Sequence, residues 1–233
     1  MRGAMSAREM VPELLDILAP DDPRAIRSRG DLLRINGMMR QSAIMAKLMG
    51  DLPPPKILAD LGGGDARFLL GVAKRLKDRW QDVTVVIADR KPIVSAQTRA
   101  RFVRLGWRCE SVSGDIFTTL PLIRPDIITA NLFLHHLEDS ALAQLLALVA
   151  ERTKSFVACE PRRSAFALLG ARLVGVLGAN DVTRHDAVAS VRAGFRGTEL
   201  SALWPPNNAK GPSWILRERG VFPFTHALVA HAV

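Results

Sequence analysis

Three glycines and an acidic residue stand together where one apolar run of the chain ends. The residues after Lys56 are apolar as far as Asp60, the glycines follow at positions 62–64, and a helix-like run begins near Asp65. Glycines let the backbone turn sharply and approach a ligand, and the first N–H groups of the helix point at the same place. Asp60 stands at the carboxyl end of the predicted strand, where open α/β sheets bind ligands. The stretch therefore predicts a site for a nucleotide-type cofactor.

The same stretch does not suit a bound phosphate group. No Gly-Lys-Ser/Thr follows the glycines, as a phosphate-binding loop requires, and Arg67 stands where the dinucleotide fingerprint has a glycine. The carboxylate of Asp60 repels a phosphate but attracts a cation or an amine. A cofactor that carries a positive charge near the turn fits these residues better.

The pattern Asp60-x-Gly62-x-Gly64-x-Ala66 resembles motif I of the class I S-adenosylmethionine (SAM) dependent methyltransferases. In that family the acidic residue lies near the positively charged methionine end of SAM, and the glycines, here Gly62, Gly63 and Gly64, make room for the cofactor. A glycine is frequent in the family where this chain has Ala66. The alternative is a glycine turn without a catalytic role.

Two later strand ends carry acidic residues that the resemblance places around the adenosine of SAM. Asp89 ends a β-branched run about 25 residues after the glycines, and its two oxygens can accept hydrogen bonds from both ribose hydroxyls. Its position resembles motif II, and Arg90 would line the adenosine pocket. Asp115 resembles the motif III acid beside the adenine amino group, with Ile116 or Phe117 over the ring. The alternative for each aspartate is an ordinary turn or helix cap.

The fourth predicted strand, residues 126–131, leads into residues that could act on a substrate. Asn131 ends the strand and resembles motif IV. His135 and His136 follow in the segment Leu-Phe-Leu-His-His-Leu, which looks like that of small-molecule methyltransferases acting on quinone precursors and phenols. A histidine can remove a phenolic proton at neutral pH. Adjacent helical residues point apart, so we expect only one of the pair to face the site, and a packing role is the alternative.

His185 is the third candidate for a catalytic base, because Asp186 stands beside it. The alternative is that Asp186 caps the helix predicted from about 187 to 194 and leaves His185 exposed. We expect no metal at His135 and His136, because no carboxylate recurs at ligand spacing around the pair.

Three polar residues are candidates for binding the acceptor. Arg163 follows the fifth predicted strand, which ends at Glu160, and it either pairs with Glu160 or binds an acidic group of the substrate. Asn180 and Arg184 lie in a stretch from about 165 to 208 that exceeds the single helix which the methyltransferase core needs there. Its mixture of apolar and polar side chains suits a largely apolar ligand, so we interpret it as a substrate lid.

Strands and helices alternate along the chain from residue 51 onwards, which predicts an α/β fold. The resemblance implies a seven-stranded Rossmann-like methyltransferase sheet, mostly parallel with an antiparallel last strand, and helices on both faces. The last two strands would meet in a hairpin with its turn at 218–220. Residues 1–50 have apolar residues at helical spacings and predict a helical N-terminal cap over the cofactor mouth, or else a helix pair on the sheet edge. Residues 51–233 would form the SAM-binding core.

The composition limits the class of protein. The chain has 233 residues, 48% hydrophobic content and a net charge of +9, which suit one α/β domain with a small appendage. Cys109 and Cys159 make neither a disulfide framework nor a metal site, and no signal peptide begins the chain, so we expect a cytoplasmic protein. The longest apolar run, about 165–179, is too short and too interrupted to span a bilayer. The scattered basic residues predict a solvated surface rather than a nucleic-acid site.

Together these features predict a SAM-dependent methyltransferase that acts on a small, mostly apolar acceptor. O-methylation of an aromatic or polyketide-like secondary metabolite is the first hypothesis, and C-methylation of a quinone-type ring is the second. An RNA methyltransferase is the third hypothesis, and a non-catalytic partner protein with the SAM fold is the fourth. The lack of an added RNA-binding domain argues against the RNA methyltransferase. The presence of both Asp60 and Asp89 argues against the non-catalytic partner protein. The apolar N-terminal helices would suit a homodimer.

Overall fold

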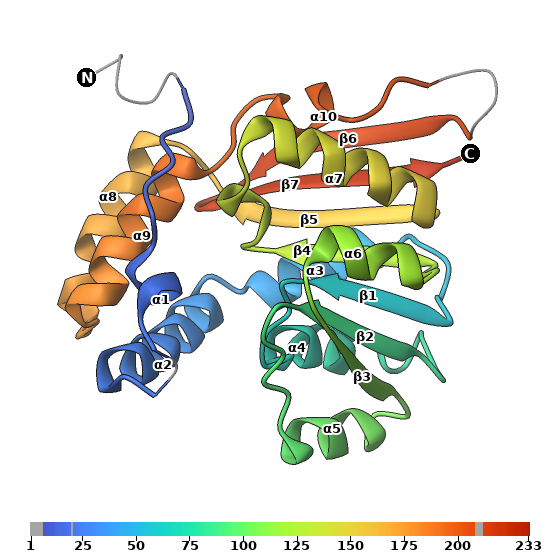
Figure 1. Ribbon diagram of the computed structural model, residues 1–233, viewed down its shortest axis with the longest axis horizontal. Helices are drawn as coiled ribbons and strands as arrows, with labels where there is room; N and C mark the ends of the chain where they lie inside the picture. The colour runs from blue at the N-terminus through green and yellow to red at the C-terminus, as the bar shows by residue number, and fades with distance from the viewer. Residues whose placement is uncertain (1–6, 20, 208–211) are drawn as a thin grey trace.

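In this computed structural model, seven strands form one sheet with helices on both faces (Figure 1). The structure describes residues 7–19, 21–207 and 212–233. The strand order is β3-β2-β1-β4-β5-β7-β6, and β7 runs antiparallel to its neighbours β5 and β6 while the other pairs are parallel. The fold class predicted from the sequence is confirmed. The strands are β1 (Ile57–Leu61), β2 (Thr84–Asp89), β3 (Arg108–Ser113), β4 (Ile127–Asn131), β5 (Ser155–Pro161), β6 (Trp214–Val221) and β7 (Thr225–Ala232).

Helices of very different length precede β1 and connect the strands that follow. Among the described helices, none is both long enough and apolar enough to cross a membrane. The α-helices are α1 (Leu14–Ile17), α2 (Pro23–Met38), α3 (Gln41–Met49), α4 (Arg67–Leu76), α5 (Ala96–Val103), α6 (Ile116–Thr119), α7 (Asp139–Arg152), α8 (Ala165–Leu173), α9 (Asp181–Ala193) and α10 (Glu199–Ala202). Short 3-10 turns are η2 (Leu120–Leu122), η3 (Leu134–His136) and η4 (Val174–Leu177).

Alternate side chains of the central strands enter two cores, one on each face of the sheet. Along β5, Val157 and Cys159 pack with residues of α3, α4 and α5, whereas Phe156 and Ala158 pack with residues of α6, α7 and α10. A parallel sheet that is covered on both faces needs strands that are apolar on both sides, and β5 is buried along its whole length. The two cores therefore hold the strand ends, and the residues on them, in fixed positions.

The N-terminal helices and the segment after β5 form one group at the carboxyl ends of the strands. In Figure 1 this group, made of α1, α2, α8 and α9, lies at the left of the sheet. Helices α1, α2 and α8 all contact α9, whereas α3 packs on α4 and β5. The predicted cap and the predicted lid thus pack against each other. Residues 1–6 and 20 of the predicted cap, and residue 208 of the predicted lid, lie outside the described residues.

Helix α9 begins at Asp181 rather than at about residue 187. The side chain of Asn180 accepts a hydrogen bond from the N–H of Thr183, which starts the helix there. Asp186 therefore lies inside the helix and does not cap it, which corrects one of the two roles expected for that residue.

The turn between β6 and β7 lies at residues 222–224, not at 218–220. Strand β6 continues through the predicted turn because Glu218 is held within it. The Glu218 carboxylate accepts hydrogen bonds from the N–H groups of Leu200 and Ser201 and lies 2.6 Å from Nε2 of His226 on β7. Pro223 has no N–H to offer the ladder, so the pairing ends beside it.

Gly194 provides a test of the packing between α9 and β5. A Cβ on Gly194 would lie 2.3 Å from the carbonyl oxygen of Pro161, so we expect Gly194→Ala to lower the free energy of unfolding by about 1–3 kcal/mol. Gly30 in α2 has no atom within 4 Å of the corresponding position. There Gly30→Ala should raise stability by about 0.5–1 kcal/mol, because alanine favours helix. Urea unfolding of both variants measures the difference, and equal stabilities would contradict the packing described.

Candidate active site

The turn after β1 accepts only glycine at two of its positions. Gly62 has a φ of +68°, and a Cβ on it would lie 2.4 Å from Cδ2 of Phe133. A Cβ on Gly63 would lie 2.8 Å from Oδ2 of Asp60. Both distances are shorter than real side chains allow, so the turn is held against the end of β4 and against its own acidic residue. Helix α4 starts directly after the turn, at Arg67.

Asp60 is a buried carboxyl group at the end of β1. Its Oδ1 accepts a hydrogen bond of 2.7 Å from Oγ1 of Thr129 on β4. Burial raises the pKa of Asp60 to about 7, although the Thr129 hydrogen bond opposes the shift, and the nearby charge of Asp89 adds to it. A cation placed beside Asp60 would therefore stabilise its ionised form.

Asp89 is fixed at the end of β2 by two backbone groups. Gly64 donates its N–H to Oδ2 at 2.9 Å, and Lys91 donates its N–H to Oδ1 at 2.8 Å. Each carboxylate oxygen has about two lone-pair sites, so each keeps one for a further donor. The carboxylate is thus held in place with one free acceptor site on each oxygen, as two neighbouring hydroxyl groups require.

Arg90 and Asp115 form an ion pair of 2.9 Å next to Asp89. Asp115 also accepts the N–H of Phe117 at 2.9 Å and so caps α6. The Phe117 hydrogen bond and Arg90 together lower the pKa of the Asp115 carboxyl. Ile116 is buried in the core, while Phe117 is half-buried and packs against it. Of the two apolar residues, Phe117 is therefore the more accessible to a ligand.

Two buried side-chain amides among the described residues have unsatisfied atoms. Oδ1 of Asn131, at the end of β4, has no hydrogen-bond partner, and both amide atoms of Gln41, at the start of α3, have none. A buried polar atom without a partner costs about 1–3 kcal/mol, so the Asn131 oxygen at the end of β4 is available to a hydrogen-bond donor of a ligand. Asn131 was expected at the site from the sequence.

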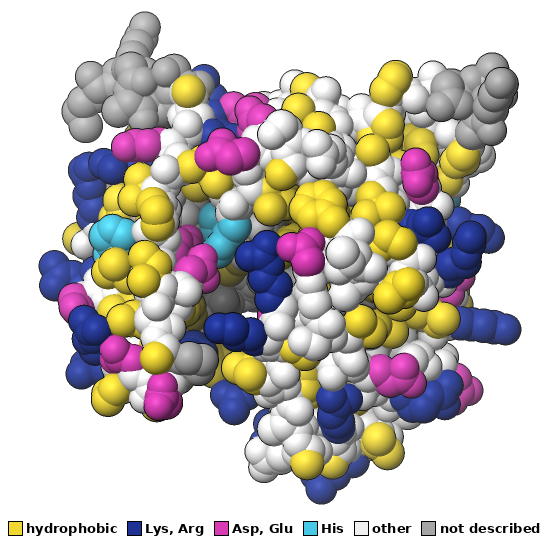
Figure 2. Space-filling view, in the orientation of Figure 1, with side chains coloured by type: hydrophobic (Ala, Val, Ile, Leu, Met, Phe, Trp, Pro, Cys, Tyr) yellow, Lys and Arg dark blue, Asp and Glu magenta, His cyan; other side chains and the backbone are white. Residues whose placement is uncertain are grey.

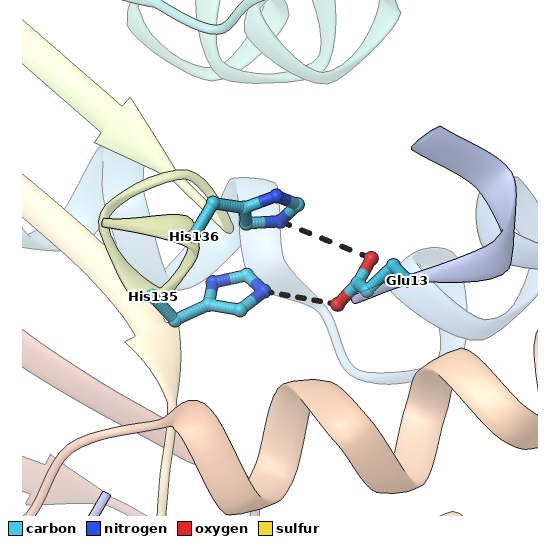
Figure 3. A group of neighbouring side chains, drawn as sticks. All are labelled: Glu13, His135 and His136. Carbon is cyan, nitrogen blue, oxygen red and sulfur yellow. Dashed lines mark hydrogen bonds and ion pairs between the residues drawn. The ribbon is translucent and has the colours of Figure 1, made fainter. Parts of the chain in front are cut away.

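The two neighbouring histidines lie on η3 and share a carboxylate from far away in the chain. Nε2 of His135 is 3.4 Å from Oε1 of Glu13, and Nε2 of His136 is 3.8 Å from Oε2 of Glu13 (Figure 3). The expectation that only one of the pair faces a site is wrong, because the two rings meet edge to face, 4.2 Å apart, and both turn towards Glu13. Glu13 is 122 residues from His135, so the spacing argument against a carboxylate partner missed it.

Glu160 at the end of β5 holds η3 in place. Its Oε1 accepts the N–H groups of Phe133 and Leu134 at 3.0 and 2.9 Å, and its Oε2 lies 2.8 Å from Nδ1 of His135. Glu160 contacts η3, whereas Arg163 contacts Gly194 and Glu199. Unsatisfied N–H groups at the start of η3 take up its carboxylate.

His135 carries a strongly shifted pKa. Burial disfavours its charged form, but the hydrogen bonds and charges of Glu13 and Glu160 outweigh burial and raise the pKa of His135 to about 9. The same ion pairs lower the pKa of Glu13 against the effect of its burial. The group thus needs positive charge between its carboxylates.

His185 lies apart from this group. Its Nδ1 is 2.9 Å from Oδ1 of Asp186, and its side chain is 41% exposed. Asp186 is buried and accepts the N–H groups of Leu14 and Leu15 at 2.7 and 3.0 Å. Asp186 therefore caps α1 rather than its own helix, and His185 belongs to the contact between α1 and α9.

Arg163 does not have the accessible position expected of a substrate ligand. Its side chain is fully buried, donates to the carbonyl oxygen of Gly194 at 2.5 Å and forms an ion pair with Glu199. A buried cation needs hydrogen-bond and ion-pair partners, and the guanidinium finds them in the segment after α9, which it thereby connects to the end of β5. The structure therefore assigns it a structural role.

Asn180 and Arg184 likewise have positions within the helical group. Asn180 caps α9 and donates from Nδ2 to the carbonyl oxygen of Arg24 at 2.9 Å, which joins α9 to α2. Arg184 is exposed and lies against Gly175 of η4. Asn180 is thus engaged in structural contacts, while Arg184 remains a candidate at the edge of the group.

A large apolar cavity lies between the helical group and the ends of β4 and β5. Its volume is about 890 Å³. Its polar lining includes Arg40, Lys47 and Ser190, and Ser190 also donates a hydrogen bond to Glu13, so the histidine group lies next to the cavity. Leu132 lines the cavity and directly precedes the Phe133 that covers Gly62. Apolar residues that line it include Leu32, Ile35, Met39, Ala171, Leu173, Val176, Leu177 and Phe222.

Comparisons with known proteins identify the fold. No protein-family model matches the sequence, and no curated protein does. The solved structure of the plantazolicin methyltransferase BpumL, in complex with S-adenosylhomocysteine (SAH), matches with a TM-score of 0.63 over 91% of each chain at 12% identity. The mitomycin 7-O-methyltransferase MmcR matches with a TM-score of 0.57 at 20% identity over 94% of this chain and 60% of its own.

An O-methyltransferase family protein of Burkholderia thailandensis matches with a TM-score of 0.57 at 15% identity, over 100% of this chain and 67% of its own. The chain thus spans about three fifths of the mitomycin enzyme but nine tenths of the plantazolicin enzyme. The motifs read from the sequence and the strand order agree with these matches. The chain has the Rossmann-like fold of the class I SAM-dependent methyltransferases.

Proposed function

We propose that this chain is a SAM-dependent enzyme that methylates a hydroxyl group of a small, mostly apolar acceptor. The observation that carries the proposal is the position of a cofactor-type turn and a large apolar cavity at the same end of the sheet, with Leu132 and Phe133 joining them. Ligands of open α/β sheets bind at this end, and apolar cavities with few polar groups bind apolar ligands.

The residues around the turn fit SAM. Asp89 offers one acceptor site on each oxygen to the ribose hydroxyls. The unsatisfied oxygen of Asn131 would accept a hydrogen bond from the amino group of the methionine part, and Asp60 would face its positive charge. Arg90, Asp115 and Phe117 would border the adenine. When bound, SAM supplies a methyl group on a sulfonium centre that a nucleophile can displace.

The cavity favours an acceptor with a large apolar part. Its lining is contributed by α2, α3, α8, η4, α9 and the β6–β7 hairpin, and few of those residues are polar. The names of two structural neighbours, which refer to plantazolicin and to the 7-O-position of mitomycin, support a natural product as the acceptor. We therefore propose O-methylation of an aromatic or polyketide-like metabolite, with C-methylation of a quinone-type ring as the second candidate.

Most of the rate would come from holding the acceptor oxygen in line with the methyl group in a water-poor site. Of the three histidines expected from the sequence, His135 and His136 are next to the cavity through Ser190, whereas His185 pairs with Asp186 on α9. Of the pair, His136 is thus the candidate for taking the proton that a hydroxyl acceptor loses, because a pKa of about 9 leaves the ring of His135 protonated at neutral pH.

An RNA acceptor is a second candidate that the charge of +9 allows. On the visible face, however, acidic side chains lie between the basic ones, and the basic ones form no continuous tract (Figure 2). RNA affinity falls steeply with salt because phosphate contacts release counterions. Activity on RNA that is lost between low and high salt would favour this candidate, and activity on apolar phenols that is insensitive to salt would exclude it.

Removal of the Asp89 carboxylate should weaken SAM binding at least tenfold, or about 1.4 kcal/mol, because two ribose contacts and the support of Gly64 are lost. Calorimetric titration of the wild type and of Asp89→Ala measures the effect. Asp78→Ala is the control, since Asp78 is exposed and forms an ion pair with neighbouring Lys77 on the surface. Equal affinity of wild type and Asp89→Ala, with both folded by circular dichroism, would contradict the assignment of the ribose site.

The pKa of about 7 at Asp60 predicts a pH dependence that separates SAM from SAH. In the free protein, ionisation of the buried carboxyl costs stability as pH rises through 7, because the folded-state pKa lies above the unfolded value. The sulfonium charge favours ionised Asp60, so SAM should gain up to about tenfold in affinity over SAH between pH 6 and pH 8. SAH lacks that charge but has the same amino and carboxyl groups, which removes their titration from the ratio.

Asp60→Asn should abolish this change in the ratio, because an amide does not titrate. Calorimetric titrations of both ligands at the two pH values measure it. A SAM-to-SAH ratio that stays constant with pH in the wild type would show that Asp60 does not face the sulfonium.

Filling the cavity should impair acceptor use without affecting SAM. Ala171 lines the cavity and is small and buried, so Ala171→Phe should raise the KM for an apolar phenol at least tenfold while the Kd for SAM stays unchanged. Ala100→Phe, on the exposed side of α5, is the matched control. Mass spectrometry of a panel of alkylated phenols, quinols and RNA identifies the methylated product, and nuclear magnetic resonance separates O- from C-methylation. SAM binding without product from any acceptor would favour a non-catalytic partner protein.

A further inference from the structure

The two histidines on η3 are oriented in the same unusual way. Each has a carboxylate at Nδ1, since His135 Nδ1 is 2.8 Å from Glu160 and His136 Nδ1 is 3.3 Å from Asp16. Each also turns its Nε2 towards the carboxylate of Glu13 (Figure 3). Neutral imidazoles that donate through Nδ1 would therefore present two lone pairs to a third carboxylate. This arrangement is repulsive unless positive charge lies between Glu13 and the rings.

The distances within the group are too long for good hydrogen bonds but suit ligands around an ion. The Nε2 atoms lie 3.4 and 3.8 Å from the nearer oxygens of Glu13, whereas N–H···O bonds measure about 2.7–3.2 Å. A tetrahedral zinc ion with bonds of about 2.0–2.1 Å separates its ligand atoms by about 3.4 Å. Donor atoms of all three residues lie within 4.8 Å of one another. The His135–Glu13 distance equals the separation around a zinc ion, and the His136–Glu13 distance exceeds it by about 0.4 Å, so a small movement of the exposed His136 would complete the ligand set.

We propose that Glu13, His135 and His136 form a binding site for a divalent cation, with zinc the ion that two imidazoles and one carboxylate fit best. Two histidines and a glutamate are a ligand set that binds zinc in enzymes and leaves a fourth position for water or a ligand. The proposal concerns ion binding alone; while an ion occupies Nε2 of both rings, neither ring can take the proton that a hydroxyl acceptor loses.

The surroundings provide the second layer that zinc sites require. Metal-bound histidines usually donate their other N–H to a carboxylate, which fixes the ring and strengthens the ligand. Glu160 does this for His135 and is itself held by the N–H groups of Phe133 and Leu134. Asp16 lies in the same position for His136. Glu13, Asp16 and Glu160 thus place three carboxylates around the two rings, and an ion bound at the two Nε2 atoms would take the place of the proton that these carboxylates favour on His135.

The ion would join two parts of the chain that are far apart in sequence. Glu13 is the residue before α1, while the histidines belong to η3 after β4. Metal binding should therefore stabilise the contact of the N-terminal segment with the core. This predicts a rise in Tm on adding zinc, because a ligand that binds only the folded state stabilises it.

Untagged protein, treated with a chelator and dialysed, should bind one zinc ion per chain with a Kd in the micromolar range or below. Competition with a chromophoric zinc chelator gives the stoichiometry and affinity, and cobalt in place of zinc should give the strong visible absorption of a tetrahedral site. His136→Ala should weaken binding at least tenfold and remove the cobalt spectrum. His136 is partly exposed, so this variant keeps the buried contacts of His135.

Glu13→Gln should weaken zinc binding in the same way, and the Tm rise should disappear in both variants. His231→Ala is the matched control, because His231 on β7 lies opposite Ser155 at the start of β5, the other end of that strand from Glu160, and this variant should bind zinc as the wild type does. Circular dichroism confirms that each variant is folded. No saturable binding by the wild type would overturn the proposal and show that protons alone supply the charge. Unchanged binding in His136→Ala and Glu13→Gln would overturn it as well, since the ion would then lie elsewhere.

Discussion

One buried carboxylate, that of Glu160, positions most of what surrounds the end of β4. It accepts the N–H groups of Phe133, Leu134 and His135 and holds the ring of His135, with no exposure to solvent. Phe133, whose N–H it fixes, lies so close to Gly62 that no side chain fits there. The cofactor turn, the histidine pair and the entrance to the cavity therefore share one anchor. A charge buried this deeply is costly unless all its hydrogen bonds are made, which ties the local geometry of three strands together.

The N-terminal segment completes the site from outside the sheet. Arg8 donates to the carbonyl oxygens of Leu137 and Ala193, each at 2.9 Å, and its guanidinium lies 4.4 Å from the centre of the Phe195 ring. Asp186 caps α1 from within α9. Polar contacts thus hold residues 8–15 against both η3 and α9. The N-terminal segment thus covers His135, which is 3% exposed.

The sequence predicted the parts of the site that depend on local order. Gly62, Gly64, Asp89 and Asn131 stand at strand ends, and strand ends follow from short apolar runs and the turns after them. Asp60 was placed correctly at the end of β1, but its burial and raised pKa depend on Thr129 of the neighbouring strand. The spacing of residues carries no information about such contacts between strands.

Long-range partners account for what the sequence could not show. Glu13 meets His135 across 122 residues, and Asp186 meets Leu14 across 172. An arginine such as Arg163 can bind an anionic ligand, but its guanidinium here forms an ion pair with Glu199, which lies on another element. The prediction of a turn at 218–220 was wrong for the same reason, since contacts with His226 and with the start of α10 keep Glu218 within β6. Only the tertiary contacts decide between a binding role and a structural one for such residues.

The residues that line the cavity differ from those that form the glycine turn and its acidic neighbours. Leu132 and Pro161 come from the ends of the parallel strands, and the other described lining residues belong to the N-terminal helices, to the segment from α8 to α9 and to the β6–β7 hairpin. None of Asp60, Gly62, Asp89 and Asn131 is among them. Apart from Leu132, which precedes the Phe133 beside Gly62, residues of the wall can therefore be substituted without changing any residue of the turn. The shape of the cavity and the residues of the turn can thus vary independently of each other.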